Sequence, residues 1–194
     1  MQATQHFTPP RQAICAGLLE RPLWPGLAGD PNRPLLASLL TGRLCGEGCL
    51  SATLGLGRKE YGRLLATYFP GPAGSLGRLK DGAAEDIPEL DDIVTLLLDH
   101  RAQRRQSEVW VARIIAAGCA GRDHLWQDLG LANRNELSQL LWINFPTLAR
   151  ANTGDMKWKK FIYKQMCERD GTYVCPAPSC RECADHPLCF SPET

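Results

Sequence analysis

The sequence has little of what several classes of protein require. Its 194 residues carry a formal net charge of only +1, and aromatic residues make up 7%. A near-neutral chain has no global electrostatic attraction for DNA or RNA. The longest apolar runs, such as the one at 93–98, are far shorter than the roughly 20 residues that span a bilayer. We therefore expect no nucleic-acid partner and no membrane partner.

Signals for export and for catalysis are also missing. Residues 1–11 are polar, include Pro9 and Pro10, and have neither the charged start nor the apolar run of a signal peptide. We therefore expect a cytoplasmic protein. The glycine-rich stretches at 55–57 and 71–77 lack the lysine of a phosphate-binding loop, which indicates ordinary turns. No nucleophile is paired with a base in a known pattern, so we do not expect an enzyme.

Helical spacing of apolar residues dominates the sequence, and no sustained period-two alternation predicts a strand. Asn133 with Glu136 three residues later is typical of a helix N-terminus. Helices are predicted at 10–20, 34–43, 59–69, 88–101, 106–120, from 133 to an interruption at Pro146, and at 157–168. We expect an all-α fold, with a single helical domain at 1–170 and an irregular cysteine-rich tail at 171–194 packed on or near it.

Cysteine is the residue that this chain has in excess. Nine cysteines are an odd number, so they cannot all pair within one chain, and a reducing compartment disfavours disulfides. Four of them, Cys175, Cys180, Cys183 and Cys189, follow the spacing C-x4-C-x2-C-x5-C. A short stretch with four thiols and three prolines cannot build a hydrophobic core. Metal–thiolate bonds can order it instead.

The spacing favours an iron–sulfur cluster over zinc. Zinc sites with four cysteines usually use two C-x2-C pairs, and only one is present in this tail. The first three cysteines have the C-x4-C-x2-C spacing of plant-type ferredoxins, in which thiolates hold an iron–sulfur cluster. A zinc-stabilised helical interaction module and an electron-transfer iron–sulfur protein stay open as alternatives.

Two segments before the tail add a family resemblance. They read Asp-His-Leu-Trp-Gln-Asp-Leu-Gly-Leu at 123–131 and Met-Lys-Trp-Lys-Lys-Phe at 156–161. Together with the cysteine motif, these segments resemble NifQ, a family that serves nitrogen fixation. The resemblance runs from about residue 22 to residue 190 and so covers most of the chain.

The resemblance implies a function that spacing alone does not show. NifQ proteins bind a molybdenum–iron–sulfur cluster and supply molybdenum for assembly of the nitrogenase iron–molybdenum cofactor. Carried over to this chain, the family's motif falls on Cys175, Cys180, Cys183 and Cys189, which would hold that cluster or its [4Fe-4S] or [3Fe-4S] precursor. The implied acceptors of molybdenum are nitrogenase cofactor-assembly proteins, a scaffold and the iron protein. Molybdate or an iron–sulfur donor would act upstream.

A molybdenum donor must release its metal, so we expect the molybdenum corner of the cluster to have an exchangeable or mixed set of ligands. Our hypothesis is that three tail cysteines fix iron, while the fourth cysteine, a histidine or a small ligand completes the molybdenum corner. His186 lies inside the tail, between Cys183 and Cys189, where ligation of the cluster and a hydrogen bond to its sulfide or thiolate both stay open. If the tail folds back on the helical body, His100 and His124 are the first body ligands to consider, with Cys167 in reserve. Packing and helix-end roles compete for these three residues.

Other chemistry-bearing residues have structural interpretations. Cys45 and Cys49 are too few for a metal site by themselves, and Cys15 and Cys119 lie in apolar helices, where free cysteine packs as a small apolar group. The basic and aromatic run at 157–164 is typical of a solvated helix face with its aromatic residues in the core. Its alternative role is to attract molybdate or an acidic partner.

Overall fold

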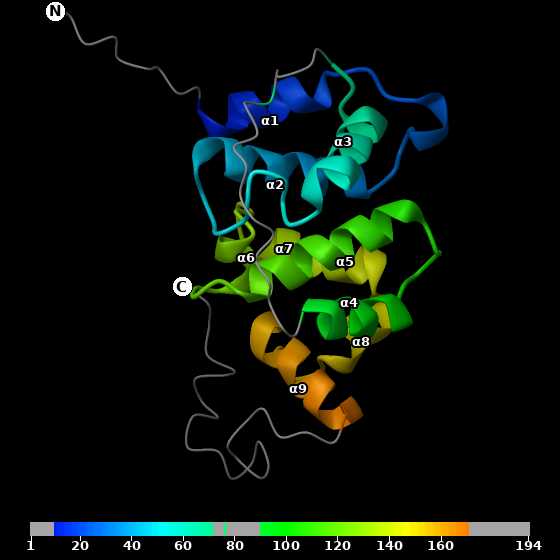
Figure 1. Ribbon diagram of the computed structural model, residues 1–194, viewed down its shortest axis with the longest axis vertical. Coiled ribbons are helices and arrows are strands. Elements are labelled where there is room, and N and C mark those ends of the chain that lie inside the picture. The colour runs from blue at the N-terminus through cyan, green and yellow to red at the C-terminus, as the bar shows by residue number, and fades with distance from the viewer. Residues whose placement is uncertain (1–9, 72–75, 77–89, 171–194) are drawn as a thin grey trace, which may run out of the picture.

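The computed structural model describes residues 10–71, 76 and 90–170 of the chain. All regular structure within these ranges is helical, which confirms the predicted all-α class there (Figure 1). The elements are α1 (Arg11–Leu19), the 3-10 helix η1 (Pro25–Leu27), α2 (Asn32–Cys45), α3 (Gly57–Tyr68), α4 (Leu90–Asp99), α5 (Gln106–Cys119), α6 (Leu125–Asp128), α7 (Arg134–Asn144), α8 (Pro146–Ala151) and α9 (Trp158–Asp170). No helix in this described part is both long and apolar enough to cross a membrane.

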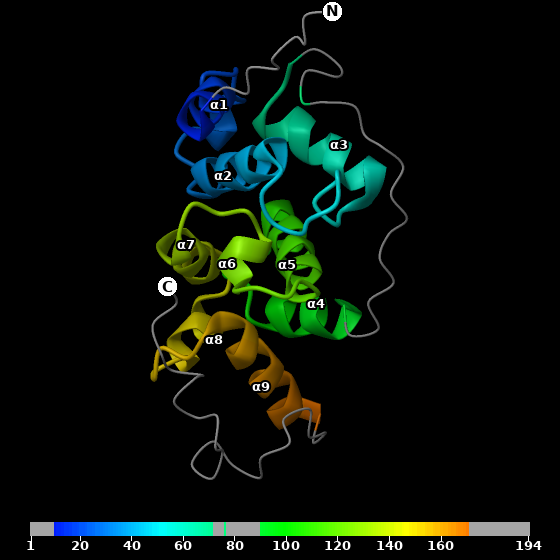
Figure 2. The ribbon, with the colours of Figure 1, turned by 90° about the vertical axis from the view of Figure 1, so that its left-hand side faces the viewer.

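The helices form an elongated stack that runs from α1 at one end to α9 at the other (Figures 1 and 2). α5 lies in the middle of the stack and packs against α3, α4, α6 and α7. α2 packs between α1 and α7, and α9 packs against α4. The last described helix, from which the cysteine tail continues in sequence, therefore lies far from α1.

α2 is buried along most of its length. Every residue at 35–42 is buried, and none of them is charged. A helix that is apolar on most sides suits a position with neighbours all round. A Cβ atom built on Gly42 would lie 2.0 Å from the carbonyl oxygen of Gly130. Gly42 is therefore required by the close approach of two backbones.

Buried polar groups fix the ends of three helices at one point. Asn32 at the start of α2 and Asn144 at the end of α7 exchange amide hydrogen bonds of 2.9 and 2.7 Å. The amide nitrogen of Asn32 also lies 3.4 Å from the hydroxyl of Ser107 in the first turn of α5. Because a buried polar group is costly without a partner, these bonds specify how the three helix ends meet.

Most of the predicted helices match the observed ones to within about two residues at each end. The predicted helix start at Asn133 is confirmed, since its side-chain oxygen accepts a 3.0 Å hydrogen bond from the backbone N–H of Glu136. The reciprocal bond differs from a complete capping box, because the Glu136 carboxylate accepts from the backbone N–H of Ala132. Pro146 not only interrupts that helix but begins α8.

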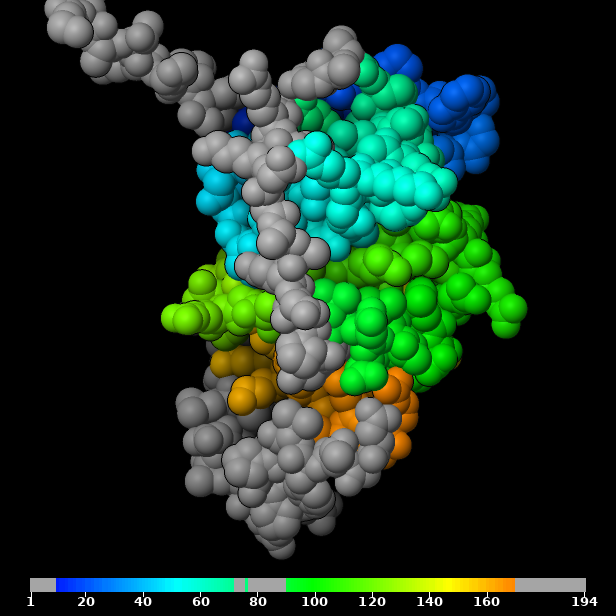
Figure 3. Space-filling model, in the orientation of Figure 1, coloured from blue at the N-terminus to red at the C-terminus, as the bar shows by residue number. Residues whose placement is uncertain are grey.

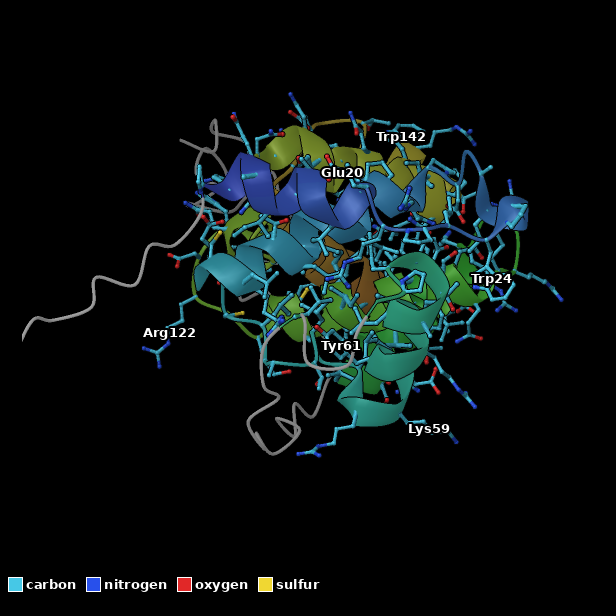
Figure 4. The ribbon with its side chains drawn as sticks, turned by 90° about the horizontal axis from the view of Figure 1, so that it is seen from above. Glu20, Trp24, Lys59, Tyr61, Arg122 and Trp142 are labelled. Atoms are coloured by element: carbon cyan, nitrogen blue, oxygen red, sulfur yellow. The ribbon has the colours of Figure 1, made fainter. Side chains whose placement is uncertain are left out.

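Two large apolar side chains are exposed in the described part of the chain. Trp24 beside η1 is 66% exposed, and Trp142 on α7 is 48% exposed. Figure 4 shows them well apart, with Trp24 near η1 and Trp142 on the side of α7. The two residues therefore do not form one apolar patch, and single exposed side chains of this kind are normal on a protein surface.

Candidate metal centre

The predicted ligands Cys175, Cys180, Cys183, Cys189 and His186 lie outside the described residues. The structure describes instead the helix that leads into them. α9 ends at Asp170, five residues before Cys175. Five residues span at most about 18 Å, so the end of α9 limits where the cysteine motif can begin.

Lys159 fastens the start of α9 to the segment after α5. Its ammonium group donates hydrogen bonds to the carbonyl oxygens of Gly121 at 3.0 Å and Asp123 at 2.8 Å. It also pairs with the carboxylate of Asp128. The Lys159 side chain is 19% exposed and that of Asp128 is 4% exposed. The ion pair is thus largely removed from water, and every partner of the ammonium group is defined.

The basic run at 157–164 is only partly the solvated face that the sequence predicts. Two of its aromatic residues are buried as predicted, namely Trp158 and Phe161. Lys159 departs from the prediction, because it lies three residues before the fully buried Ile162 and shares its side of the helix. This spacing is the signal in the sequence that could have identified Lys159 as buried. Lys160, the next residue, is exposed.

The two segments that carry the family resemblance meet at this ion pair. Lys159 belongs to the segment at 156–161, and Asp128 belongs to the segment at 123–131. Asp128 also accepts a hydrogen bond from the backbone N–H of Asp123, at 3.2 Å to Oδ2. The segments therefore share a structural role, which is to hold α9 against the body of the protein.

The other end of α9 lies beside the end of α4. The guanidinium group of Arg169 is 3.9 Å from the carboxylate of Asp99. Cys167 in the same turn is half-buried. In Figure 3 the surface of α9 directly adjoins that of α4. The buried Lys159 ion pair thus holds the start of the helix that precedes the cysteine motif, and packing against α4 supports the helix, with only a weak, exposed ion pair at its other end.

The two candidate histidines lie at opposite ends of α9. His124 caps the start of α6 and follows the residue whose carbonyl oxygen binds Lys159. His100 follows Asp99, the partner of Arg169. The 13 residues of α9 rise about 20 Å between these two points. His100 is therefore the neighbour in sequence of the α4 residue that Arg169 contacts, whereas His124 lies near the start of α9.

Two cysteines of the helical body, Cys45 and Cys119, favour the neutral thiol. Burial raises the pKa of Cys119 to about 12 and outweighs the nearby charge of Lys159, which lowers it. Burial, and then the charge of Glu47, raise the pKa of Cys45. Metal ligation requires a thiolate, so the packing interpretation suits both residues. Among the residues that the structure describes, no three His, Cys, Asp or Glu side chains come together as a potential metal site.

Comparison with known proteins bears directly on the cysteine motif. The model of the NifQ family matches residues 35–191, a range that includes most of the helical body and all four tail cysteines. The chain belongs to the NifQ family. This finding confirms the resemblance and places the chain in nitrogen fixation.

Three curated relatives show how far the similarity extends. NifQ of Azotobacter vinelandii is 44% identical over 174 residues, with 84% of this chain and 89% of the relative covered. A NifQ homologue of Sinorhizobium fredii (strain NBRC 101917 / NGR234) is 38% identical over 180 residues, with 89% and 78% covered. NifQ of Rhodobacter capsulatus is 35% identical over 162 residues, with 82% and 87% covered. No solved structure matches the chain.

Proposed function

We propose that this NifQ-family protein is a metallocluster carrier and not an enzyme. It binds a molybdenum–iron–sulfur cluster on Cys175, Cys180, Cys183 and Cys189 and donates molybdenum for assembly of the nitrogenase iron–molybdenum cofactor. The observation that carries the proposal is the C-x4-C-x2-C-x5-C motif inside the range matched by the NifQ family. The acceptors are the scaffold and the iron protein of cofactor assembly, and molybdate or an iron–sulfur donor loads the carrier.

The chemistry of the donor set fits this cargo. Thiolates are soft ligands, and they are the usual ligands of iron in sulfide clusters. The links of four and five residues on either side of the single C-x2-C pair allow the chain to approach several faces of one cluster. A structural zinc ion, by contrast, is usually enclosed by two C-x2-C pairs.

The helical body supports the proposal by giving the motif a fixed origin. Lys159 anchors the start of α9, and Arg169 pairs with Asp99 at its end. Two cysteines of the body, Cys45 and Cys119, have raised pKa values and favour the neutral thiol. In this proposal the helical body positions the cysteine tail, and the tail binds the metal cluster.

Metal analysis of the full-length protein, purified without oxygen, tests this proposal. Serine is substituted for each tail cysteine in turn, and iron, molybdenum and zinc per chain are measured together with the visible absorption of the cluster. We expect each tail variant to lose most of its iron and molybdenum. Cys49→Ser serves as the matched control, because Cys49 is an exposed cysteine of the body and its variant should stay fully loaded.

Other metal contents would select one of the alternatives. A colourless protein that contains zinc and no iron would support an interaction module. An iron-containing protein that never takes up molybdenum and is reversibly reduced would support an electron-transfer role. For a carrier, molybdenum lost from the loaded protein should appear in the acceptor when the two are mixed and separated again. Retention of all metals after replacement of the four cysteines would contradict the proposal.

A further inference from the structure

One edge of the helical stack carries an exposed indole next to an arginine-rich connection. Trp24 immediately precedes η1 and is 66% exposed. The connection between α4 and α5 reads His-Arg-Ala-Gln-Arg-Arg at 100–105. Figure 1 shows η1 and this connection on the same side of the molecule, and Figure 4 places Trp24 on that side. Together they form one surface, the Trp24 edge, which consists of Trp24, Arg101, Arg104 and Arg105.

A chain of contacts joins the two parts of the Trp24 edge. The carbonyl oxygen of Trp24 accepts a 2.8 Å hydrogen bond from the backbone N–H of Leu27. The carbonyl oxygen of Leu27 accepts a 3.0 Å hydrogen bond from the backbone N–H of Asp30. The Asp30 carboxylate in turn lies 4.0 Å from the guanidinium group of Arg105. The indole and the arginines are therefore neighbours in the fold, although they are far apart in the sequence.

The indole is carried by a backbone that is already ordered. Trp24 lies between Pro22 and Pro25, and proline restricts the conformations of the chain around it. Just before this segment, the guanidinium group of Arg33 donates a 2.6 Å hydrogen bond to the carbonyl oxygen of Arg21. A large side chain on an ordered segment loses little entropy when it is buried by a partner. Exposure of one tryptophan is normal by itself, so the inference depends on its arginine neighbours as well.

The arginines give this edge an excess of positive charge. Arg104 and Arg105 are exposed, and the third arginine of the edge is half-buried. Within the described residues, only Arg105 of the three takes part in an ion pair, at 4.0 Å from Asp30, whose side chain is 4% exposed. Asp99, just before the connection, pairs with Arg169. Arginine and tryptophan are enriched among the residues that dominate binding at protein interfaces, so this edge has the composition of a docking surface.

We propose that the Trp24 edge docks onto an acidic surface of the protein that receives molybdenum. The indole is buried in an apolar recess of that partner, and the arginines face its carboxylates. The inference rests on the proposed function, which supplies the identity of the partner. An acidic protein fits better than a nucleic acid, because the chain as a whole is near neutral. It also fits better than a membrane, because a helix that lies on a membrane needs a broad apolar face, whereas Trp24 is one isolated exposed indole.

Binding of the full-length protein to the purified scaffold protein and to the purified iron protein of cofactor assembly tests the inference. The variants are Trp24→Ala and the double charge reversal Arg101→Glu with Arg104→Glu. We expect Trp24→Ala to weaken binding to at least one acceptor by more than about tenfold, mainly through faster dissociation. The double charge reversal should lower the association rate constant at low salt by about tenfold or more and make binding less sensitive to salt.

Each variant has a matched control. Trp142→Ala removes the other exposed tryptophan of the described residues, and Arg122→Glu with Lys160→Glu reverses two exposed cations outside the edge. Figure 4 shows Arg122 on the opposite side of the molecule from Trp24. Both controls should bind the acceptors as wild type does. All variants should keep the urea midpoint and the metal content of wild type, because none of the substituted side chains is buried.

The outcomes distinguish this inference from the proposed function. The inference is overturned if Trp24→Ala binds the acceptors as tightly as Trp142→Ala, or if both double charge reversals have the same effect. It is also overturned if metal-free and loaded wild type bind neither acceptor. If Trp24→Ala weakens binding only to single-stranded DNA or to vesicles that contain phosphatidylserine, the partner is of another class and the inference fails. The proposed function fails instead if wild type takes up no molybdenum, which the docking of metal-free protein does not require.

Discussion

Replacement of Lys159 by methionine tests whether the buried ion pair holds the last helix in place. The substitution keeps an unbranched side chain of similar length but removes the ammonium group. The carboxylate of Asp128, which is 4% exposed, then loses its cationic partner. The carbonyl oxygens of Gly121 and Asp123 lose a hydrogen-bond donor as well.

The magnitude follows from the burial of the pair. Removal of one partner from a buried ion pair costs about 3–5 kcal/mol, chiefly because a charge is left without compensation. The Lys159 side chain is still 19% exposed, so water can partly solvate the remaining charge, and we expect about 3 kcal/mol. This is a large share of the roughly 5–15 kcal/mol that stabilises a typical domain.

Urea unfolding of the metal-free protein, followed by circular dichroism, measures this loss. With a slope of about 2 kcal/mol per molar urea, the midpoint should fall by roughly 1.5 M. Lys160→Met is the matched control, because Lys160 is the neighbouring lysine and is exposed. It should change stability by less than about 0.5 kcal/mol. Addition of Asp128→Asn to Lys159→Met should restore part of the loss, because no uncompensated carboxylate then stays buried.

The reasoning is refuted if Lys159→Met and Lys160→Met unfold at the same urea concentration. It is also refuted if Asp128→Asn adds its full cost to that of Lys159→Met, since the two side chains would then act independently. Either result would mean that the start of α9 is held by apolar packing alone.

Two further predictions concern packing and pH. Gly42→Ala places a methyl group against the backbone of Gly130 and should lower the free energy of unfolding by about 1–3 kcal/mol, measured by urea unfolding. The control Gly17→Ala, where an added methyl group meets no atom within 4 Å, should leave stability unchanged or raise it. Equal effects of the two substitutions would contradict the close contact. The pKa of Cys119 rises from 9.0 to about 12 in the folded protein, so its contribution to stability is complete below pH 9.0 and is lost as the pH rises toward 12. Between these values wild type should therefore lose about 1.4 kcal/mol per pH unit more than Cys119→Ala, and parallel pH profiles would disprove the shift.

The helices could be predicted from the sequence where apolar periodicity is long. The apolar spacing of α5 and the proline boundary of α8 are local signals, so they are visible without the fold. α6 has only four residues, too few for a period to appear, and its position depends on contacts made elsewhere. The start of α7 was predictable because Asn133 and Glu136 interact across three residues.

The candidate site was predictable only in its chemistry. Four cysteines in one short stretch indicate a metal ligand set whatever the fold. The placement of His100 and His124 relative to α9 was not available from sequence, because it depends on how the helix ends meet in the fold. The spacing of Lys159 to Ile162 indicates its partial burial, but its partner could not be foreseen, since Asp128 lies 31 residues earlier in the chain.

The buried Lys159 ion pair, which holds α9 against the body, has a consequence for metal retention under the proposed function. A tail covalently tied to the end of α9 would stay close to the body, so a metal-bound group of the tail would meet a group of the body at an effective concentration in the millimolar range. A metal that dissociates from one ligand there would meet a neighbouring ligand quickly, so rebinding would compete with its diffusion into solution. A substitution that detaches α9 from the body should therefore speed the loss of metal, even though it removes no ligand.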